Sequence, residues 1–229
     1  MSIPKRLPAT PRGSSLESLV ADVAALYERI EADQKAFLEG AAARGAILDC
    51  PSGCGACCEP FVPDLLPPEA AFMAAWLLDS APELAREAAA WTAADRAAVP
   101  PCPFLREEKK ARCAIYPARP LVCRLFGAAG VSDREGHASF RPCAHMPLAG
   151  YPPIGESRPT ITGTELVRAF GSEPPLMASY AAELTSLSPS LASHRRLIVE
   201  ALPPALARVA LSLSLAEQSP LPAYLGRDG

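Results

Sequence analysis

Residues 50–58 read CPSGCGACC and place four cysteines within nine positions. Such a short segment brings its sulfur atoms together in a local turn whatever the rest of the core requires, so packing alone does not explain it. Clustered thiolates are the ligands of zinc and of iron–sulfur clusters. The sequence therefore predicts a metal or redox site, with eight candidate ligands: Cys50, Cys54, Cys57, Cys58, Cys102, Cys113, Cys123 and Cys143.

The adjacent pair Cys57-Cys58 limits how these thiols combine. Neighbouring side chains point to opposite faces of a strand, or about 100° apart on a helix, so they rarely converge on one tetrahedral centre. Two interpretations stay open. The eight thiols form two four-sulfur sites that meet at this pair, or one site uses four thiols while the others are packed or redox-active. We favour the use of all eight.

The composition favours a helical protein with its own core. Of the 229 residues, 49% are hydrophobic and 6% aromatic, and the prevalence of alanine, leucine and proline indicates helices joined by proline-broken loops. The formal net charge of -3 argues against a general nucleic-acid surface. The most apolar stretch, residues 201–216, contains Pro203, Pro204 and Arg208 and falls short of the ~20 residues of a bilayer crossing. We expect neither nucleic-acid nor membrane binding.

The N-terminal sequence is not that of a signal peptide. Its basic residues are followed by Glu17 and Asp22 and not by an unbroken apolar segment. We therefore expect a cytoplasmic protein, in which a reducing environment makes the cysteines metal ligands instead of disulfide partners.

The chain divides into four predicted parts. Residues 1–13 are a disordered leader, and residues 14–45 form a helix with apolar side chains at spacings of three and four. Residues 46–160 form the cysteine-cluster metal-binding domain, with two inserted helices, one beginning near Pro67 and one over residues 82–98. Residues 161–229 form a helical region. The predicted fold is mostly α, with helices flanking a compact, irregular, cysteine-rich metal-binding segment.

The helices of the last region are predicted individually. They cover residues 164–170, 175–187 and 190–202. Residues 209–215 alternate like a strand but lie among alanines that suit a helix, so this assignment stays open.

Two arginines on either side of Cys123 are candidate cofactor-binding residues. A centre held by four thiolates is strongly anionic, and the guanidinium groups of Arg119 and Arg124 would offset that charge. His145, two residues after Cys143, is a weaker candidate, and we expect His137 and His194 to be solvated.

The cysteine blocks also carry a family resemblance. The 50–58 cluster, then CPFL at residues 102–105 and CAIYPARPLVCRLF at residues 113–126, closely resemble the bacterial YkgJ-type cysteine-cluster family. That family is described as a zinc- or iron-chelating CxxCxxCC domain, and the resemblance spans residues 50 to about 145. Related clusters occur in a flagellin lysine N-methylase, which makes a cluster-dependent lysine N-methyltransferase-like enzyme the alternative function.

We expect a metal-binding protein with a structural, redox or metal-handling role. An iron–sulfur cluster is favoured over zinc, because the Cys50-Pro51 and Cys102-Pro103 pairs resemble the Cys-Pro endings of ferredoxin runs. The sequence leaves open whether the protein is an enzyme, its oligomeric state, and which protein partner or substrate it has. The glycine-spaced loop at residues 127–130 lacks a surrounding strand–loop–helix pattern, which argues against a Rossmann-type cofactor site.

Overall fold

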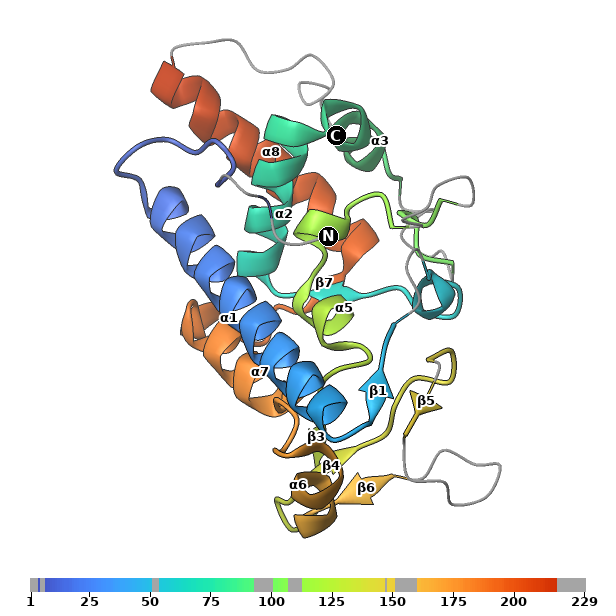
Figure 1. Cartoon of the computed structure of the whole chain (residues 1–229). Coiled ribbons are helices and arrows are strands. Elements are labelled where there is room, and N and C mark those ends of the chain that lie inside the picture. The colour runs from blue at the N-terminus through green and yellow to red at the C-terminus, as the bar shows by residue number, and fades with distance from the viewer. Residues whose placement is uncertain are drawn as a thin grey trace.

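The computed structural model describes residues 4, 7–50, 54–92, 101–106, 113–146, 148–150 and 160–217, which include all eight cysteines. The fold is mostly α, as predicted (Figure 1). Its described α-helices are α1 (Ser15–Ala43), α2 (Pro67–Ser80), α3 (Pro82–Ala89), α5 (Leu121–Leu125), α6 (Thr164–Phe170), α7 (Met177–Ser186) and α8 (Ile198–Glu217). Short 3-10 helices lie at η1 (Ala56–Cys58), η2 (Tyr116–Ala118) and η3 (Pro189–Leu191).

The described strands are short and pair locally. They are β1 (Ile47–Leu48), β2 (Asp64–Leu65), β3 (Val131–Ser132), β4 (Ala138–Phe140), β5 (Leu148–Ala149), β6 (Ile161–Thr162) and β7 (Arg196–Leu197). β1 pairs with β5, β2 pairs with β7, and β3, β4 and β6 form a three-stranded sheet; all of these pairs are antiparallel.

The long N-terminal helix is confirmed and follows from its sequence. The Ser14 hydroxyl accepts a hydrogen bond from the Glu17 N–H at 3.1 Å, which satisfies one of the unpaired donors of the first turn. At the other end Gly45 adopts a positive φ of 85°, which glycine tolerates best. Val23, Leu26, Ile30 and Phe37 of the apolar stripe are buried by the chain itself, whereas Leu16 and Leu19 near the start of the helix are half-buried.

Two hydrophobic cores stabilise the protein, and α1 contributes to both. The main core contains buried side chains of α1, α2, α3, α5, α7 and α8, with α2 and α8 packed along each other. The second core lies near the C-terminal end of α1, beside α6 and the three-stranded sheet (Figure 1). There Phe37, Phe140 and Phe170 stack edge to face with ring centroids 5.4–5.7 Å apart. Because α1 spans both cores, it holds the cysteine-rich segment and the C-terminal helices in one framework.

Two helix predictions need correction. The helix predicted over residues 82–98 ends at Ala89, and residues 93–98 lie outside the described part of the chain. The helix predicted over 190–202 is wrong: η3 and β7 precede a later helix, α8. Residues 209–215, which were open between strand and helix, belong to α8, and Pro203 and Pro204 lie inside it. Burial of the α8 face against α2 outweighs the cost of two prolines in a helix.

α8 also has the length and composition of a membrane-crossing helix, which the sequence analysis did not find. Within this 20-residue helix, the most apolar 18-residue window has a mean hydropathy of 1.5, and 39% of that window is buried. The core helix of a soluble protein passes the same test. Leu202 and Leu206 on this helix are fully buried in the main core, so the composition alone assigns no membrane role.

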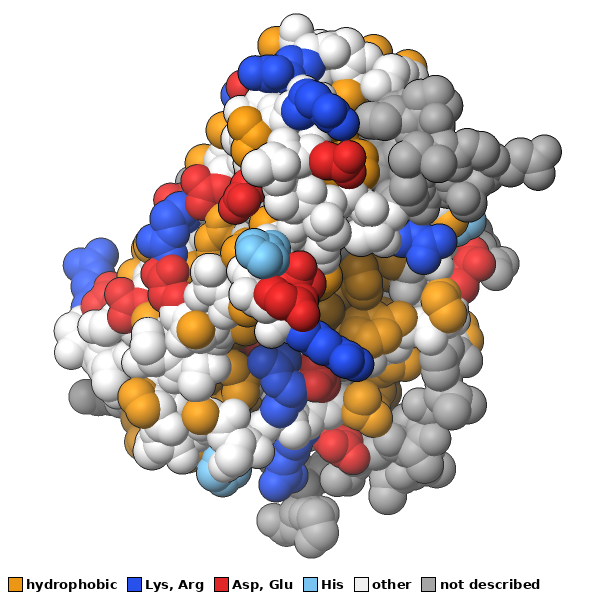
Figure 2. All heavy atoms as spheres, turned by 90° about the horizontal axis from the view of Figure 1, so that it is seen from below, with side chains coloured by type: hydrophobic (Ala, Val, Ile, Leu, Met, Phe, Trp, Pro, Cys, Tyr) orange, Lys and Arg blue, Asp and Glu red, His pale blue; other side chains and the backbone are white. Residues whose placement is uncertain are grey.

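The surface is mixed in charge where Figure 2 shows it. On this face, Lys and Arg side chains lie among Asp and Glu side chains, and hydrophobic side chains line a hollow beside them. This mixture agrees with the small net charge of -3.

Candidate metal centre

The cysteines come from segments with little regular structure, positioned by the surrounding helices. Cys50 follows β1, Cys54 precedes η1, and Cys57 and Cys58 lie within η1. Further along the chain, Cys102 and Cys113 lie in loops, Cys123 lies within α5, and Cys143 follows β4. The structure joins none of the eight in a disulfide.

Backbone hydrogen bonds place three of these segments side by side. The Cys102 N–H donates to the Cys58 carbonyl at 2.8 Å, and Leu105 pairs with Cys113 in a β-bridge. The next bond, from the Ala114 N–H to the Phe104 carbonyl at 2.9 Å, extends this contact. Segments that are 44 and 11 residues apart in sequence, Cys58 to Cys102 and Cys102 to Cys113, are therefore neighbours in space.

A different contact joins the two ends of the cysteine-rich segment. The pairing of β1 with β5 sets Ile47 opposite Ala149 and Leu48 opposite Leu148, so the chain before Cys50 lies beside the chain after Cys143. Gly150, with a φ of 71°, approaches the Gly45 carbonyl so closely that a Cβ atom at this position would overlap it. The turn after β5 therefore requires glycine.

This close approach gives a testable expectation. Gly150→Ala should lower the free energy of unfolding by roughly 2–3 kcal/mol, because it adds a backbone clash to the strain of alanine at positive φ. Gly136→Ala is the matched control, because Gly136 has a φ of 86° but no atom near the position of an added Cβ. It should lose only the cost of alanine at positive φ, about 1 kcal/mol. Urea denaturation of both variants measures the difference, and equal losses would contradict the contact.

The thiols lie close enough to affect one another's ionisation. A hydrogen bond to Cys58, followed by burial, raises the pKa of Cys57, and a hydrogen bond to Cys102 raises the pKa of Cys58 to about 12. The same bond lowers the pKa of Cys102. Burial and then the charge of Cys113 raise the pKa of Cys123 well above its usual value. Thiols crowded in this way become thiolates together only when a cation is bound among them.

The cysteine thiols are chemically suited to bind a zinc ion or an iron–sulfur cluster. Eight thiol sulfurs from separate segments lie in one region, and soft thiolate ligands select these metals. Among the described residues, no three His, Cys, Asp or Glu side chains are already arranged as metal ligands. Binding would therefore draw the side chains together around the metal, as in proteins whose metal sites form only when loaded.

Arg119 is the cation beside the thiols. Its guanidinium lies over the Tyr116 ring, 4.2 Å from the centroid, and its buried Nε has no hydrogen-bond partner. Its positive charge lowers the pKa of thiols from separate segments, offsetting part of the increase there; these are Cys50, Cys57, Cys113 and Cys123. This placement suits the predicted role of compensating thiolate charge.

Arg124 points toward α1 instead. Its side chain is fully buried, with Nη1 donating to Glu31 at 2.8 Å and Nη2 donating to the Pro117 carbonyl at 2.5 Å. The guanidinium also lies 4.1 Å from the centroid of the Tyr27 ring. The backbone carbonyl of Arg124 accepts a hydrogen bond from Gln34. Arg124 therefore anchors α5, and with it Cys123, against α1.

The two arginines should respond differently to substitution. Arg119→Ala should weaken metal affinity about 10- to 100-fold with a smaller effect on folding, as expected for a group that supports metal ligands. Arg124→Ala should lower the free energy of unfolding by about 3 kcal/mol, because it leaves Glu31 without its buried partner. Competition with a chelator measures affinity and urea denaturation measures stability. Arg141→Ala, which removes an exposed arginine near Cys143, controls for charge.

The three histidines are weaker candidates for the metal centre than the cysteines and Arg119. The His145 backbone N–H donates to the Cys143 sulfur at 3.5 Å, so this contact to the site comes from the main chain and not from the imidazole. His137 pairs with Asp133 at 3.4 Å, and His194 is exposed.

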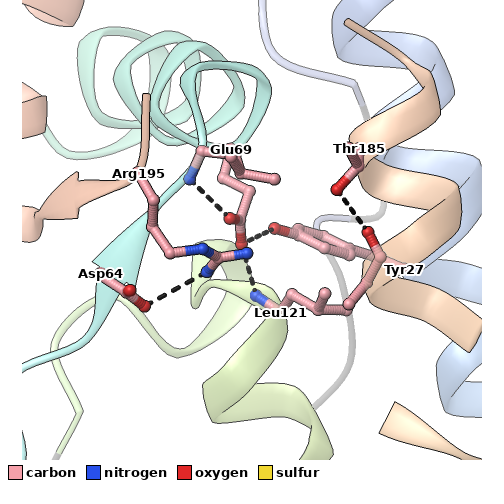
Figure 3. A network of polar contacts seen from close by, with 8 residues as sticks. Tyr27, Asp64, Glu69, Leu121, Thr185 and Arg195 are labelled. Atoms are coloured by element: carbon pink, nitrogen blue, oxygen red, sulfur yellow. Dashed lines mark hydrogen bonds and ion pairs between the residues drawn. The ribbon is translucent and has the colours of Figure 1, made fainter. Parts of the chain in front are cut away.

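Glu69 of α2 was not among the candidate site residues predicted from the sequence. The Glu69 carboxylate is buried and accepts hydrogen bonds from the N–H groups of Leu66 and Leu121 and from the Tyr27 hydroxyl, at 2.9, 2.8 and 3.3 Å (Figure 3). Arg195 lies beside it and pairs with Asp64 at 3.2 Å. Since Leu121 begins α5, Glu69 links the helix carrying Cys123 to α1 and α2. The bond from the Leu66 N–H to Glu69, three residues later, is the half of a capping box that a leucine at the N-cap allows.

The glycine-spaced loop at residues 127–130 follows α5 and precedes β3. This order, helix then loop then strand, is the reverse of a dinucleotide-binding unit. The loop therefore offers no support for a Rossmann-type cofactor site.

The comparison with protein families agrees with this geometry. Residues 49–144 match the family model described as "CxxCxxCC: Putative zinc- or iron-chelating domain". The matched range contains all eight cysteines together with Arg119 and Arg124. The match covers less than half of the chain, and it supports a metal-binding role for this cysteine-rich segment. No curated protein and no solved structure matches the chain.

Proposed function

We propose that this protein holds an iron–sulfur cluster through its clustered cysteine thiolates, with zinc as the alternative metal, in a structural, redox or metal-handling role. The observation that carries the proposal is the meeting of Cys58, Cys102 and Cys113 through backbone hydrogen bonds between distant segments. Iron is favoured because two of the cysteines precede a proline, as in ferredoxin runs. We also propose a reducing compartment, in which the thiols stay available as ligands.

The bound centre would supply a strong cross-link between loops that have little secondary structure of their own. Metal binding at structural sites contributes ~10 kcal/mol or more to folding. The chain's part is to gather the thiols, to bury Cys102 and partly bury five others, and to place the Arg119 charge beside them.

Metal analysis tests the proposal directly. The protein is purified without oxygen, its iron, acid-labile sulfide and zinc are counted per chain, and its visible absorption spectrum is recorded. We expect iron and sulfide in comparable amounts with a brown colour, or, for the alternative, stoichiometric zinc. A colourless, metal-free protein that remains folded would refute metal binding.

A further inference from the structure

We propose that the eight cysteines form two separate four-thiolate centres, an inner and an outer one. The inner centre consists of Cys58, Cys102, Cys113 and Cys123, and the outer centre consists of Cys50, Cys54, Cys57 and Cys143. This inference rests on the proposed metal binding and extends it by assigning each cysteine to one centre. It applies to two zinc ions or to two clusters.

Backbone contacts and packing define the inner set. The hydrogen bond from Cys102 to Cys58 and the bridge between Leu105 and Cys113 hold these three cysteines at the main core. Cys102 is itself a member of that core with 7% of its surface exposed, and Cys58 and Cys113 pack against it. Cys123 joins them from α5, which Glu69 and Arg124 fix to the neighbouring helices.

The outer set contains the exposed cysteines, whereas no member of the inner set is exposed. Cys50 and Cys57 are exposed, while Cys54 and Cys143 are half-buried. The β1–β5 pairing brings the chain next to Cys50 and the chain next to Cys143 together. These contacts are independent of those that assemble the inner set.

Cys57 is next to Cys58 in sequence, so the two sets meet at this adjacent pair. Four ligands for each centre, together with its exposed position, assign Cys57 to the outer set.

Cobalt titration of the full, metal-free chain tests the assignment, because thiolate-bound Co²⁺ absorbs visibly and reports each tetrahedral site it fills. We expect two Co²⁺ per wild-type chain. Cys54→Ser and Cys113→Ser should each leave one. The double variant Cys50→Ser/Cys54→Ser, confined to the outer set, should also leave one, whereas Cys54→Ser/Cys113→Ser should leave none.

The adjacent pair provides the sharpest comparison. Cys57→Ser should keep the inner Co²⁺ and lose the outer one, and Cys58→Ser should do the reverse. The retained ion should be released to a chelator slowly in Cys57→Ser and rapidly in Cys58→Ser, because two outer cysteines, Cys50 and Cys57, are exposed and no inner cysteine is.

Alkylation of the wild-type protein tests the same assignment without depending on whether inner-set variants fold. As a chelator is added stepwise, mass spectrometry should show the four outer cysteines becoming labelled together before the four inner ones. Labelling of all eight together, or in groups that mix the two sets, would overturn the assignment. So would a single Co²⁺ per wild-type chain. A wild-type protein that binds no metal through thiolate, as isolated or after titration, would instead refute the proposed function itself.

Discussion

Cys113→Ser should lose metal and lower the free energy of unfolding by roughly 5 kcal/mol or more. A structural metal contributes ~10 kcal/mol or more to folding, and a serine hydroxyl is a poor substitute for a thiolate ligand. Cys113 lies in a loop that the bridge to Leu105, the bond from the Tyr116 N–H to the Cys113 carbonyl and packing against the main core also hold, so the loss measures the metal ligand added to these contacts. Metal per chain and urea denaturation measure the two effects.

Ala114→Ser is the matched control for this substitution, since it introduces the same hydroxyl one residue away. It should keep the full metal content and change the free energy of unfolding by less than about 1 kcal/mol. Chelation of the wild-type protein should reproduce most of the loss seen in Cys113→Ser. If Cys113→Ser retained all its metal and its stability, Cys113 would not be a ligand.

Glu69→Ala should lower the free energy of unfolding by roughly 5 kcal/mol without removing a thiol. The substitution leaves three buried donors, the Leu66 and Leu121 N–H groups and the Tyr27 hydroxyl, without their acceptor. Each unsatisfied buried group costs about 1–3 kcal/mol. The control is Glu87→Ala, which removes an exposed carboxylate paired with Arg106 and should cost under about 1 kcal/mol. Similar small losses in both variants would contradict the role of Glu69.

Glu69 should also make stability depend on pH in a defined direction. Burial raises its pKa, and the hydrogen bonds from Leu66 and Leu121 oppose this increase only in part. Protonation therefore favours the folded state: the stabilising contribution is fully present below the unfolded pKa of about 4.3 and is lost as pH rises through the folded pKa. Relative to Glu69→Gln, the wild-type protein should become less stable as pH rises through this window. Parallel pH profiles would contradict the assignment.

Much of the helical framework could be predicted because its signals are local. The start of α1 follows from Ser14, its end from Gly45, and α6 begins and ends as expected from its sequence. α8 could not be predicted, because its two prolines argue against a helix and burial against α2 overrides them. That burial depends on which segment packs beside it, and a local pattern does not contain this information.

In the candidate metal centre, too, the features that depend on tertiary contacts could not be predicted from local sequence. The clustered cysteines were evident because four of them are neighbours in sequence, and the family match over residues 49–144 supports their metal-binding role. Arg119 and Arg124 looked equivalent around Cys123. Only the tertiary contact of Arg124 with Glu31, 93 residues earlier, separates a helix anchor from a cation beside the thiols. Glu69 was missed for the same reason, since its partners Tyr27 and Leu121 are 42 and 52 residues away.

X-ray absorption at the metal edge of anaerobically purified protein would test thiolate ligation most directly. A centre built from these cysteines should show a first shell of four sulfur atoms per metal, at ~2.3 Å if the metal is zinc. For an iron–sulfur cluster, a second shell of neighbouring iron atoms should appear as well. A first shell of nitrogen or oxygen atoms, with no sulfur, would contradict metal binding by the cysteine cluster.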